Sequence, residues 1–237
     1  RIMKVELPEA FREHLAEMAS PLLKHGPVAV RSSACGEDSG DAAFAGQLDT
    51  FLGINTLPAL GKAVLRCWAS YWSHRALAYQ LARKVQLTSM GVIIQTQVDP
   101  RFSGVLFTRN VQSPATNQLV LEYCEGLGEK LVSGEITPIS LILDPNGHVL
   151  HETSHTSDPA TEPKTILNDS SVRSQDETIS QAPNATASQH LPPALIEQLA
   201  HTGRQLETQF DHPQDIEWSV DQANAIYILQ SRPITTM

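Results

Sequence analysis

An acid, an amide and an arginine near the end of the sequence are the residues best suited to chemistry. Glu217 lies in the run DIEWSVD, and Gln230 and Arg232 lie in the run IYILQSRP that follows a short polar segment. The first run alternates polar with apolar residues and the second is rich in strand-forming residues, which together predict a β-hairpin. Carboxylate and amide oxygens suit Mg²⁺, and a guanidinium fork suits a phosphate. An exposed strand face with ordinary polar residues is the alternative, and the spacing alone does not separate the two.

The position of the turn decides which side chains of this hairpin share a face. If residues 221–224 form the loop, Val220 pairs with Ala225. Counting outward with a period of two then places Glu217 diagonal to Gln230, with Arg232 on the same polar face. The opposite, apolar face is predicted to carry Trp218, Val220, Ala225, Tyr227 and Leu229.

Arg31 is a second candidate for phosphate binding. It ends the short apolar run PVAVR, for which we expect a strand, and residues 32–46 are so rich in Gly, Asp, Ser and Ala that we expect a long loop there. Backbone amides of residues 32–36 would form an anion-binding nest beside the guanidinium. A surface loop whose arginine makes a salt bridge is the alternative interpretation.

Composition limits the class of protein. With 237 residues, 41% of them hydrophobic, the chain can bury a core as one domain or as two lobes. A formal charge of -9 argues against nucleic acid or a membrane surface as partner. No apolar run approaches the roughly 20 residues that span a bilayer, and the N-terminus does not resemble a signal peptide. Cys35, Cys67 and Cys124 lack disulfide or zinc spacing, so we expect reduced thiols and a cytoplasmic protein.

The hydrophobic pattern predicts an α+β fold. Helices are expected at residues 7–23, from Thr56 onward, at 73–85 and at 192–210, and further strands at 49–54, 91–98, 103–108, 118–124, 139–143 and 148–151. We expect strands 91–98, 103–108 and 118–124 to form a central sheet covered by helices. Residues 153–190 are rich in Ser, Thr, Asn and Pro and predict a disordered insertion. The expected organisation is therefore residues 1–152, the insertion 153–190, and residues 191–237 completing the same domain.

Four blocks of the sequence resemble one known family. They are VRSSACGEDSGDAAFAGQLDTFLGI, VIIQTQVDPRFSGVLFTRN, LEYCEGLGEKLVSGEITP and DIEWSVDQANAIYILQSRPIT, in this order between Val28 and Thr235. They are similar to the motifs of the nucleotide-binding domain of phosphoenolpyruvate synthase (pyruvate, water dikinase), pyruvate phosphate dikinase and rifampicin phosphotransferase. The resemblance implies an ATP-grasp fold with mixed, mostly antiparallel sheets and flanking helices, in which two lobes hold Mg²⁺-ATP.

The resemblance also implies roles for single residues. Arg31 and Arg232 would act on the phosphates as the catalytic arginines, and Glu217 and Gln230 would bind Mg²⁺. The remaining nucleotide contacts would come from Gly46 and Thr50 in the first block, from Gln95 on the strand that passes the adenine, and from Glu122 at the ribose or adenine.

Two parts of the family pattern have no counterpart in the sequence. The Gly-rich segment whose lysine grips the phosphates does not match anything before Lys4, so we expect an N-terminally incomplete domain, with Lys4 and Lys24 on the surface. The histidine that carries the phosphate lies in a separate domain of the family, and His155, within Thr153–Thr156, lacks its motif. We do not expect His155 to accept phosphate.

The resulting functional expectation is the ATP-binding domain of a dikinase-type phosphotransferase. It would pass phosphate from ATP to a histidine on a separate domain, and from there to pyruvate, a rifamycin-like molecule or a glucan. A nucleotide-binding or interaction module without turnover is the alternative.

Overall fold

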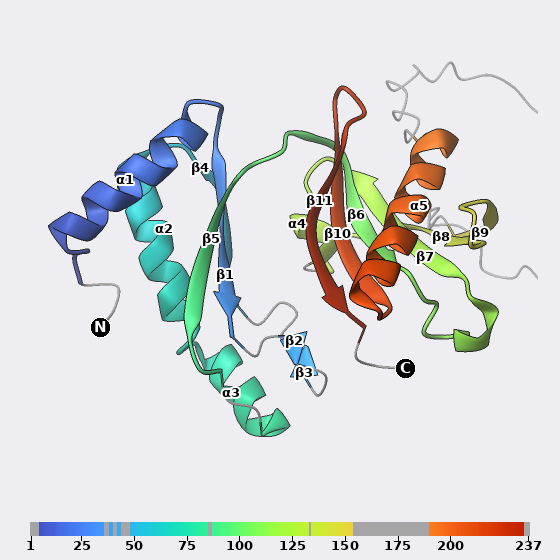
Figure 1. The fold of residues 1–237 in the computed structure, drawn as a ribbon, viewed down its shortest axis with the longest axis horizontal. Helices are drawn as coiled ribbons and strands as arrows, with labels where there is room; N and C mark the ends of the chain where they lie inside the picture. The colour runs from blue at the N-terminus through green and yellow to red at the C-terminus, as the bar shows by residue number, and fades with distance from the viewer. Residues whose placement is uncertain are drawn as a thin grey trace, which may run out of the picture.

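Two lobes, each with its own β-sheet, make up the protein. The computed structural model describes residues 5–35, 38–39, 42–43, 48–84, 87–132, 134–153 and 190–234. The described residues up to Thr96 form the N-lobe and those from Pro100 onward form the C-lobe, and the two lie side by side in Figure 1. Among the described elements the chain crosses from one lobe to the other once, between β5 and β6. The prediction of an α+β fold with mostly antiparallel sheets is confirmed.

The N-lobe is a three-stranded antiparallel sheet in the order β4-β1-β5, with helices α1 and α2 on one face. Thr56 begins α2 by accepting a hydrogen bond from the Ala59 amide, and Ser73 begins α3 in the same way through Ala76. The core of this lobe is built from apolar residues of α1, α2 and the sheet, among them Val30 and Leu60. Its elements are α1 (Glu9–Leu23), β1 (Val28–Ala34), β2 (Asp38–Ser39), β3 (Ala42–Ala43), β4 (Thr50–Ile54), α2 (Leu57–Ser70), α3 (His74–Arg83) and β5 (Met90–Thr96).

Strand β1 corrects two of the expectations. It continues to Ala34 and pairs with β5 along its whole length, so Arg31 lies in mid-strand and the nest expected from residue 32 is wrong for residues 32–34. The small polar residues remain extended here because they pair with β5 as far as Ala34, and the Ser32 amide also donates to the Asp49 carbonyl oxygen just before β4. The placing of residues 91–98 in a central sheet with 103–108 is also wrong, because β5 belongs to the N-lobe sheet.

The C-lobe is a six-stranded antiparallel sheet in the order β11-β10-β6-β7-β8-β9. Helix α5 packs across one face (Figure 1) and buries the larger core, which includes Leu106, Leu199 and Trp218. The other face looks toward the N-lobe at the β10 and β11 edge. The elements are β6 (Pro100–Phe107), the short 3-10 helix η2 (Pro114–Thr116), β7 (Leu119–Glu125), α4 (Glu129–Val132), β8 (Ile139–Leu143), β9 (Val149–Thr153), α5 (Pro193–Phe210), β10 (Gln214–Asp221) and β11 (Ile226–Pro233).

Trp218 needs a glycine beside it. Gly104 on β6 pairs with Trp218, and a Cβ atom there would come within 2.1 Å of the Glu122 carbonyl oxygen and 2.6 Å of the indole ring. Real Cβ atoms do not approach so closely, so this position requires a residue without a side chain. The indole of Trp218 is thereby fully buried in the core of the C-lobe.

The β10–β11 hairpin forms as predicted, but its register differs. Val220 pairs with Ile226 and not with Ala225, because Asp221 Oδ1 accepts hydrogen bonds from the amides of Ala223 and Ala225 and draws Ala225 into the turn. An irregularity between Glu217 and Trp218 then leaves Leu229 as an extra residue on β11.

This bulge changes the faces of the hairpin. Glu217 lies directly opposite Gln230 rather than diagonal to it. Tyr227 pairs with Ser219 and is 42% exposed, so its placing on the core face is wrong. Leu229 does not join the core either and lines the cavity described below, whereas Ile226 packs against the core.

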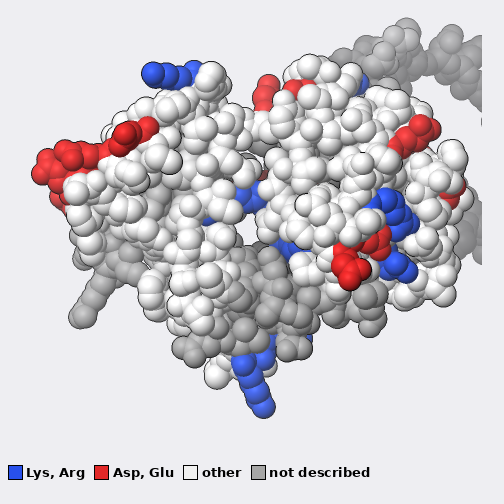
Figure 2. Space-filling model, in the orientation of Figure 1, with Lys and Arg blue, Asp and Glu red and all other residues white. Residues whose placement is uncertain are grey.

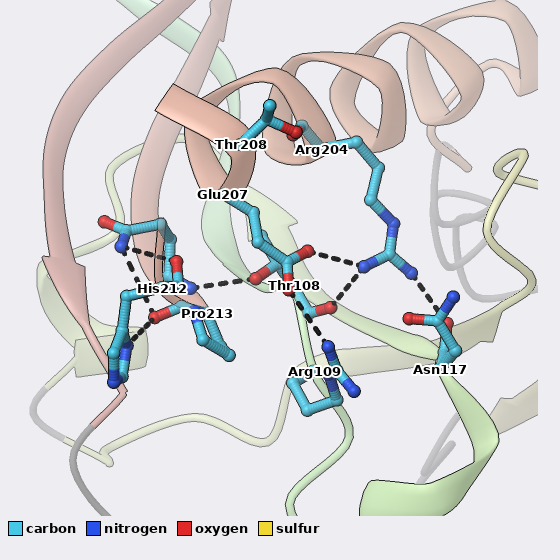
Figure 3. A network of polar contacts seen from close by, with 9 residues as sticks. Thr108, Arg109, Asn117, Arg204, Glu207, Thr208, His212 and Pro213 are labelled. Carbon is cyan, nitrogen blue, oxygen red and sulfur yellow. Dashed lines mark hydrogen bonds and ion pairs between the residues drawn. The ribbon is translucent and has the colours of Figure 1, made fainter. Parts of the chain in front are cut away.

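A polar network fastens the end of α5 to the loop after β6 (Figure 3). Arg204 donates to the Thr108 carbonyl oxygen at 2.9 Å, to the Asn117 carbonyl oxygen at 2.6 Å and to Glu207 Oε2 at 2.6 Å. Glu207 also pairs with Arg109 at 3.2 Å. These contacts give the loop that follows β6 a defined position on the sheet.

The expected insertion at 153–190 falls almost wholly outside the described residues, which resume at His190. Thr153 ends β9, and His190 lies 3.5 Å from Glu152. None of the described helices has the length and apolar character needed to cross a membrane.

Candidate functional site

A cavity of ≈ 610 Å³ lies between the two sheets. Figure 2 shows the hollow between the lobes, with Lys or Arg atoms visible inside it. The N-lobe contributes residues of β1, β4 and β5, and the C-lobe contributes the outward face of β10 and β11 together with residues 127–131. The polar and charged lining residues include Arg31, Ser32, Asp49, Thr50, Arg75, Gln95, Gln97, Glu129, Glu217, Gln230 and Arg232.

Arg31 joins the two lobes across this cavity. Its Nη2 atom donates to Glu217 Oε2 at 2.6 Å and to Gln230 Oε1 at 2.5 Å. The Arg31 side chain is 14% exposed and that of Glu217 is 21% exposed, so water screens the ion pair less than it would at the surface. Arg31 can reach both oxygens because it lies in the middle of β1, on the face of the β4-β1-β5 sheet that is turned toward the C-lobe.

Arg232 shares the same carboxylate. Its Nη2 atom lies 3.2 Å from Glu217 Oε1, and its side chain is 9% exposed. Its Nη1 atom is buried and has no hydrogen-bond partner among the described residues. Two guanidinium groups therefore converge on one carboxylate, which leaves a local excess of positive charge and an unsatisfied donor, as an anion-binding site requires.

The excess of positive charge is confined to these residues, because positive and negative side chains balance over the cavity lining as a whole. A third arginine, Arg75, is paired with Asp49 at 2.7 Å at the cavity wall. Glu129 adds a further negative charge on the opposite side. The Arg31–Glu217–Arg232 cluster is thus the part of the cavity where an anion gains most.

Glu217 and Gln230 meet the geometric requirement for a shared metal ion. Their side-chain oxygens lie on paired residues and converge on a single point, where the Arg31 Nη2 atom stands in for a cation. Carboxylate and amide oxygens are hard ligands of the kind that Mg²⁺ prefers, so the donor set fits that ion. The described residues contain no group of three or more His, Cys, Asp or Glu side chains placed to hold a metal. A metal at this point would complete its shell with ligand or water oxygens.

Of the other predicted site residues, only some line this cavity. Thr50 lies directly opposite Arg31 on β4, and Gln95 lies on β5, and both line the cavity. Gly46 lies outside the described residues. Glu122 does not line this cavity and lies instead in a neighbouring one, so the structure does not bring it to a nucleotide between the lobes.

Several lining residues had not been singled out from the sequence. Gln97 lies where the chain crosses between lobes, and its Oε1 atom accepts a hydrogen bond from the Gly53 amide at 2.6 Å. Residues 127–129 belong to the GLGE motif, which signalled the segment but no particular residue. Arg75 lies on an ordinary amphipathic helix, and no sequence pattern pointed to it.

Comparison with known proteins agrees with this geometry. The model of the pyruvate phosphate dikinase AMP/ATP-binding domain matches residues 1–237, the whole chain. The chain belongs to this family. Membership in the pyruvate phosphate dikinase AMP/ATP-binding domain family makes it an ATP-binding domain, as the resemblance predicted.

Individual relatives of this domain are much longer proteins. The chain is 34% identical to rifampicin phosphotransferase of Bacillus subtilis, with 100% of the chain and 26% of the relative covered. It is also 34% identical to a probable phosphoenolpyruvate synthase of Pyrococcus abyssi and to the prodigiosin synthesizing transferase PigC of Serratia marcescens, with 99% of the chain covered in both. These matches cover 29% of the former relative and 26% of the latter, so the chain spans under a third of each.

Proposed function

We propose that this chain binds Mg²⁺-ATP between its lobes and supplies a phosphoryl group to a histidine on a separate domain. The observation that carries the proposal is the convergence of Arg31, Glu217, Gln230 and Arg232 on one point of the interlobe cavity. Described residues 5–153 and 190–234 would act as one ATP-grasp domain interrupted by the segment at 153–190.

Each of these residues has a task in that reaction. Glu217 and Gln230 would hold Mg²⁺, which when bound neutralises phosphate charge and orients the phosphates. Arg31 and Arg232 would bind phosphate oxygens and offset the charge that develops during transfer. Thr50 and Gln95 would contact the nucleotide from the N-lobe sheet. Because the cavity is partly screened from water, these charges act more strongly than at an open surface.

The final acceptor would be pyruvate, a rifamycin-like molecule or a glucan. Relatives named rifampicin phosphotransferase and phosphoenolpyruvate synthase support a phosphotransferase of this kind. A binding module without turnover would share the cavity, and it is distinguished by showing Mg²⁺-ATP binding without any transfer of label.

Substitution of Glu217 tests the site. We expect Glu217→Gln to weaken Mg²⁺-ATP binding by roughly tenfold or more in calorimetry, because it removes the formal charge of the metal pair while it keeps the shape. Arg232→Lys should lose less affinity than Arg232→Ala but still a measurable amount, because lysine lacks the fork. Glu197→Gln on the exposed face of α5 is the matched control.

Unchanged Mg²⁺-ATP affinity of the Glu217→Gln protein, with its circular dichroism and thermal transition preserved, would contradict the proposal. Loss of folding in the same buffer would be visible in those two measurements and would shift the test to the Arg232 pair of variants.

A further inference from the structure

A second cavity, of ≈ 400 Å³, opens on the same face of the six-stranded sheet as Glu217. The register places Glu217, Val105, Glu122, Ser140 and Thr153 in one row across β10, β6, β7, β8 and β9, so their side chains point to one side. The last three line the second cavity. Arg232 lines both cavities, so the two adjoin at its side chain.

Two ionisable residues of this cavity have hydrogen-bonding capacity that the described residues leave unused. The carboxyl group of Glu122 has no hydrogen-bond partner among the described residues, and burial raises its pKa. The Nη1 atom of Arg232 is buried and equally unpaired within the described part of the chain. An unsatisfied donor at a buried position is costly, so the unpaired Nη1 atom of Arg232, together with the half-buried carboxyl group of Glu122, indicates a ligand that bonds to both.

The space between these two groups has an apolar floor. In the neighbouring row of the sheet Phe107, Val120 and Ile142 form this floor, and Asp215, which continues the row on β10 opposite Arg232, also lines the cavity. Three strand spacings, about 14 Å, separate the β11 backbone from β7. Arg232 and Glu122 reach into this gap from its two sides. A small flat ring with a hydrogen-bond donor on one edge and a nucleophilic atom on the other fits the arrangement.

We propose that the second cavity receives the phosphate acceptor, a neutral imidazole side chain, and that Glu122 is a catalytic residue that accepts a hydrogen bond from its ring N–H. The proposal rests on the proposed function, because Arg232 must hold a transferable phosphate at the border of the two cavities. The ring would lie on the floor formed by Val120 and Ile142, with its second nitrogen directed toward that phosphate.

The chemical step balances with these groups alone. The lone pair of the free ring nitrogen forms the new N–P bond, and the P–O bond to the leaving phosphate breaks with its electrons going to the leaving oxygen. The ring gains positive charge as it is phosphorylated, and its other nitrogen keeps its proton in the hydrogen bond to Glu122. A carboxylate at this place selects the reactive tautomer and offsets the charge, as in other imidazole–carboxylate pairs.

The test is made on the protein at full length, by single-turnover formation of acid-labile phosphohistidine from labelled ATP. Glu122→Gln should slow the transfer by roughly 10²-fold. The affinity of this variant for Mg²⁺-ATP should stay within about twofold of that of the parent. Glu122→Asp should recover part of the rate because it restores the carboxylate. Glu152→Gln, on the exposed strand β9 and outside both cavities, should transfer at the parental rate.

A second variant guards against a folding defect at Glu122. Ser140→Phe fills the cavity beside it, and it should also slow transfer without weakening nucleotide binding. Parental transfer rates in both Glu122→Gln and Ser140→Phe would overturn the assignment while leaving the nucleotide site intact. A parent protein that binds no Mg²⁺-ATP would overturn the proposed function itself, and the acceptor site with it.

Discussion

At the scale of single residues, Arg31 competes with a metal ion for the oxygens of Glu217 and Gln230. Nucleotide binding should relieve this competition and so favour metal binding. The guanidinium donates to the same two oxygens of Glu217 and Gln230 that would hold Mg²⁺. A divalent ion must displace it, and a phosphate that attracts the guanidinium would make this displacement easier. The protein should therefore bind metal strongly only together with nucleotide.

Removal of this guanidinium gives a direct measurement. In Arg31→Ala we expect Mn²⁺, used as a spectroscopic substitute for Mg²⁺, to bind several-fold more tightly without nucleotide, because both oxygens are free. ATP should bind more weakly, because a phosphate contact is lost. Paramagnetic resonance of free Mn²⁺ reports the first effect and calorimetry the second. Mn²⁺ binding no tighter than in the parent would show that Arg31 does not occupy the metal position.

The sequence predicted part of this site correctly. It placed Glu217, Gln230 and Arg232 on one face, but only because two errors cancelled: the assumed pairing of Val220 with Ala225 was one residue out, and the bulge at Leu229 shifts β11 back by one residue. The partner of Arg31 was not predictable, because Arg31 and Glu217 are 186 positions apart and meet only through the way the lobes face each other. Arg75 was missed because it lies on an ordinary amphipathic helix and belongs to no motif.

At the scale of elements, the errors in strand extent and strand register came from contacts with neighbouring segments, which the residue pattern of a single segment does not show. The nest was expected from the small residues after Arg31, yet pairing with β5 keeps residues 32–34 extended. The faces of the hairpin were misassigned because Asp221 draws Ala225 into the turn and Leu229 forms a bulge. The helices were placed to within a few residues, since their caps and apolar periodicity are local signals.

The turn between β8 and β9 gives a prediction about pH. His148 Nδ1 lies 2.9 Å from Asp144 Oδ2. This hydrogen bond is the main cause that lowers the pKa of Asp144 from 3.8 to about 2 and raises the pKa of His148 above 6.5. The Asp144 contribution to stability is present above pH 3.8 and is lost as the pH falls toward 2. The His148 contribution is present below pH 6.5 and is lost as the pH rises through the raised value.

The pair is therefore fully formed between these two limits. In an NMR titration we expect the His148 ring to titrate above the ordinary histidine value, and Asp144→Asn to bring it back down. Glu197 also raises the pKa of His148, so Glu197→Gln should lower it by a smaller amount. A His148 midpoint that does not change in Asp144→Asn would refute the pairing in solution.

At the scale of the whole molecule, each lobe has a core of its own. The cluster around Val30 and Leu60 shares no residue with the cluster around Leu199 and Trp218, within the described part of the chain. Proteins built in this way often unfold in more than one step. We expect two calorimetric transitions, and Mg²⁺-ATP, which contacts both lobes, should raise both and draw them together.

Matched core substitutions assign the two transitions. Leu60→Ala and Leu199→Ala remove the same atoms from sites that are 0% exposed, and each should destabilise its own lobe by about 2–5 kcal/mol. Each variant should lower one transition and leave the other nearly unchanged. A single transition that both variants lower equally would show that the lobes unfold as one unit.

The single crossing between β5 and β6 also orders events during synthesis on the ribosome. The N-lobe strands and helices are complete once Thr96 has been made, whereas Glu217 follows Arg31 by 186 residues. At about 5–20 residues per second, Arg31 emerges roughly 10–40 s before its partner. The N-lobe can therefore fold while the Arg31 side chain still lacks Glu217 and faces water. The interlobe cavity is consequently completed only when the β10–β11 hairpin has left the exit tunnel and can pack against an N-lobe that has already folded.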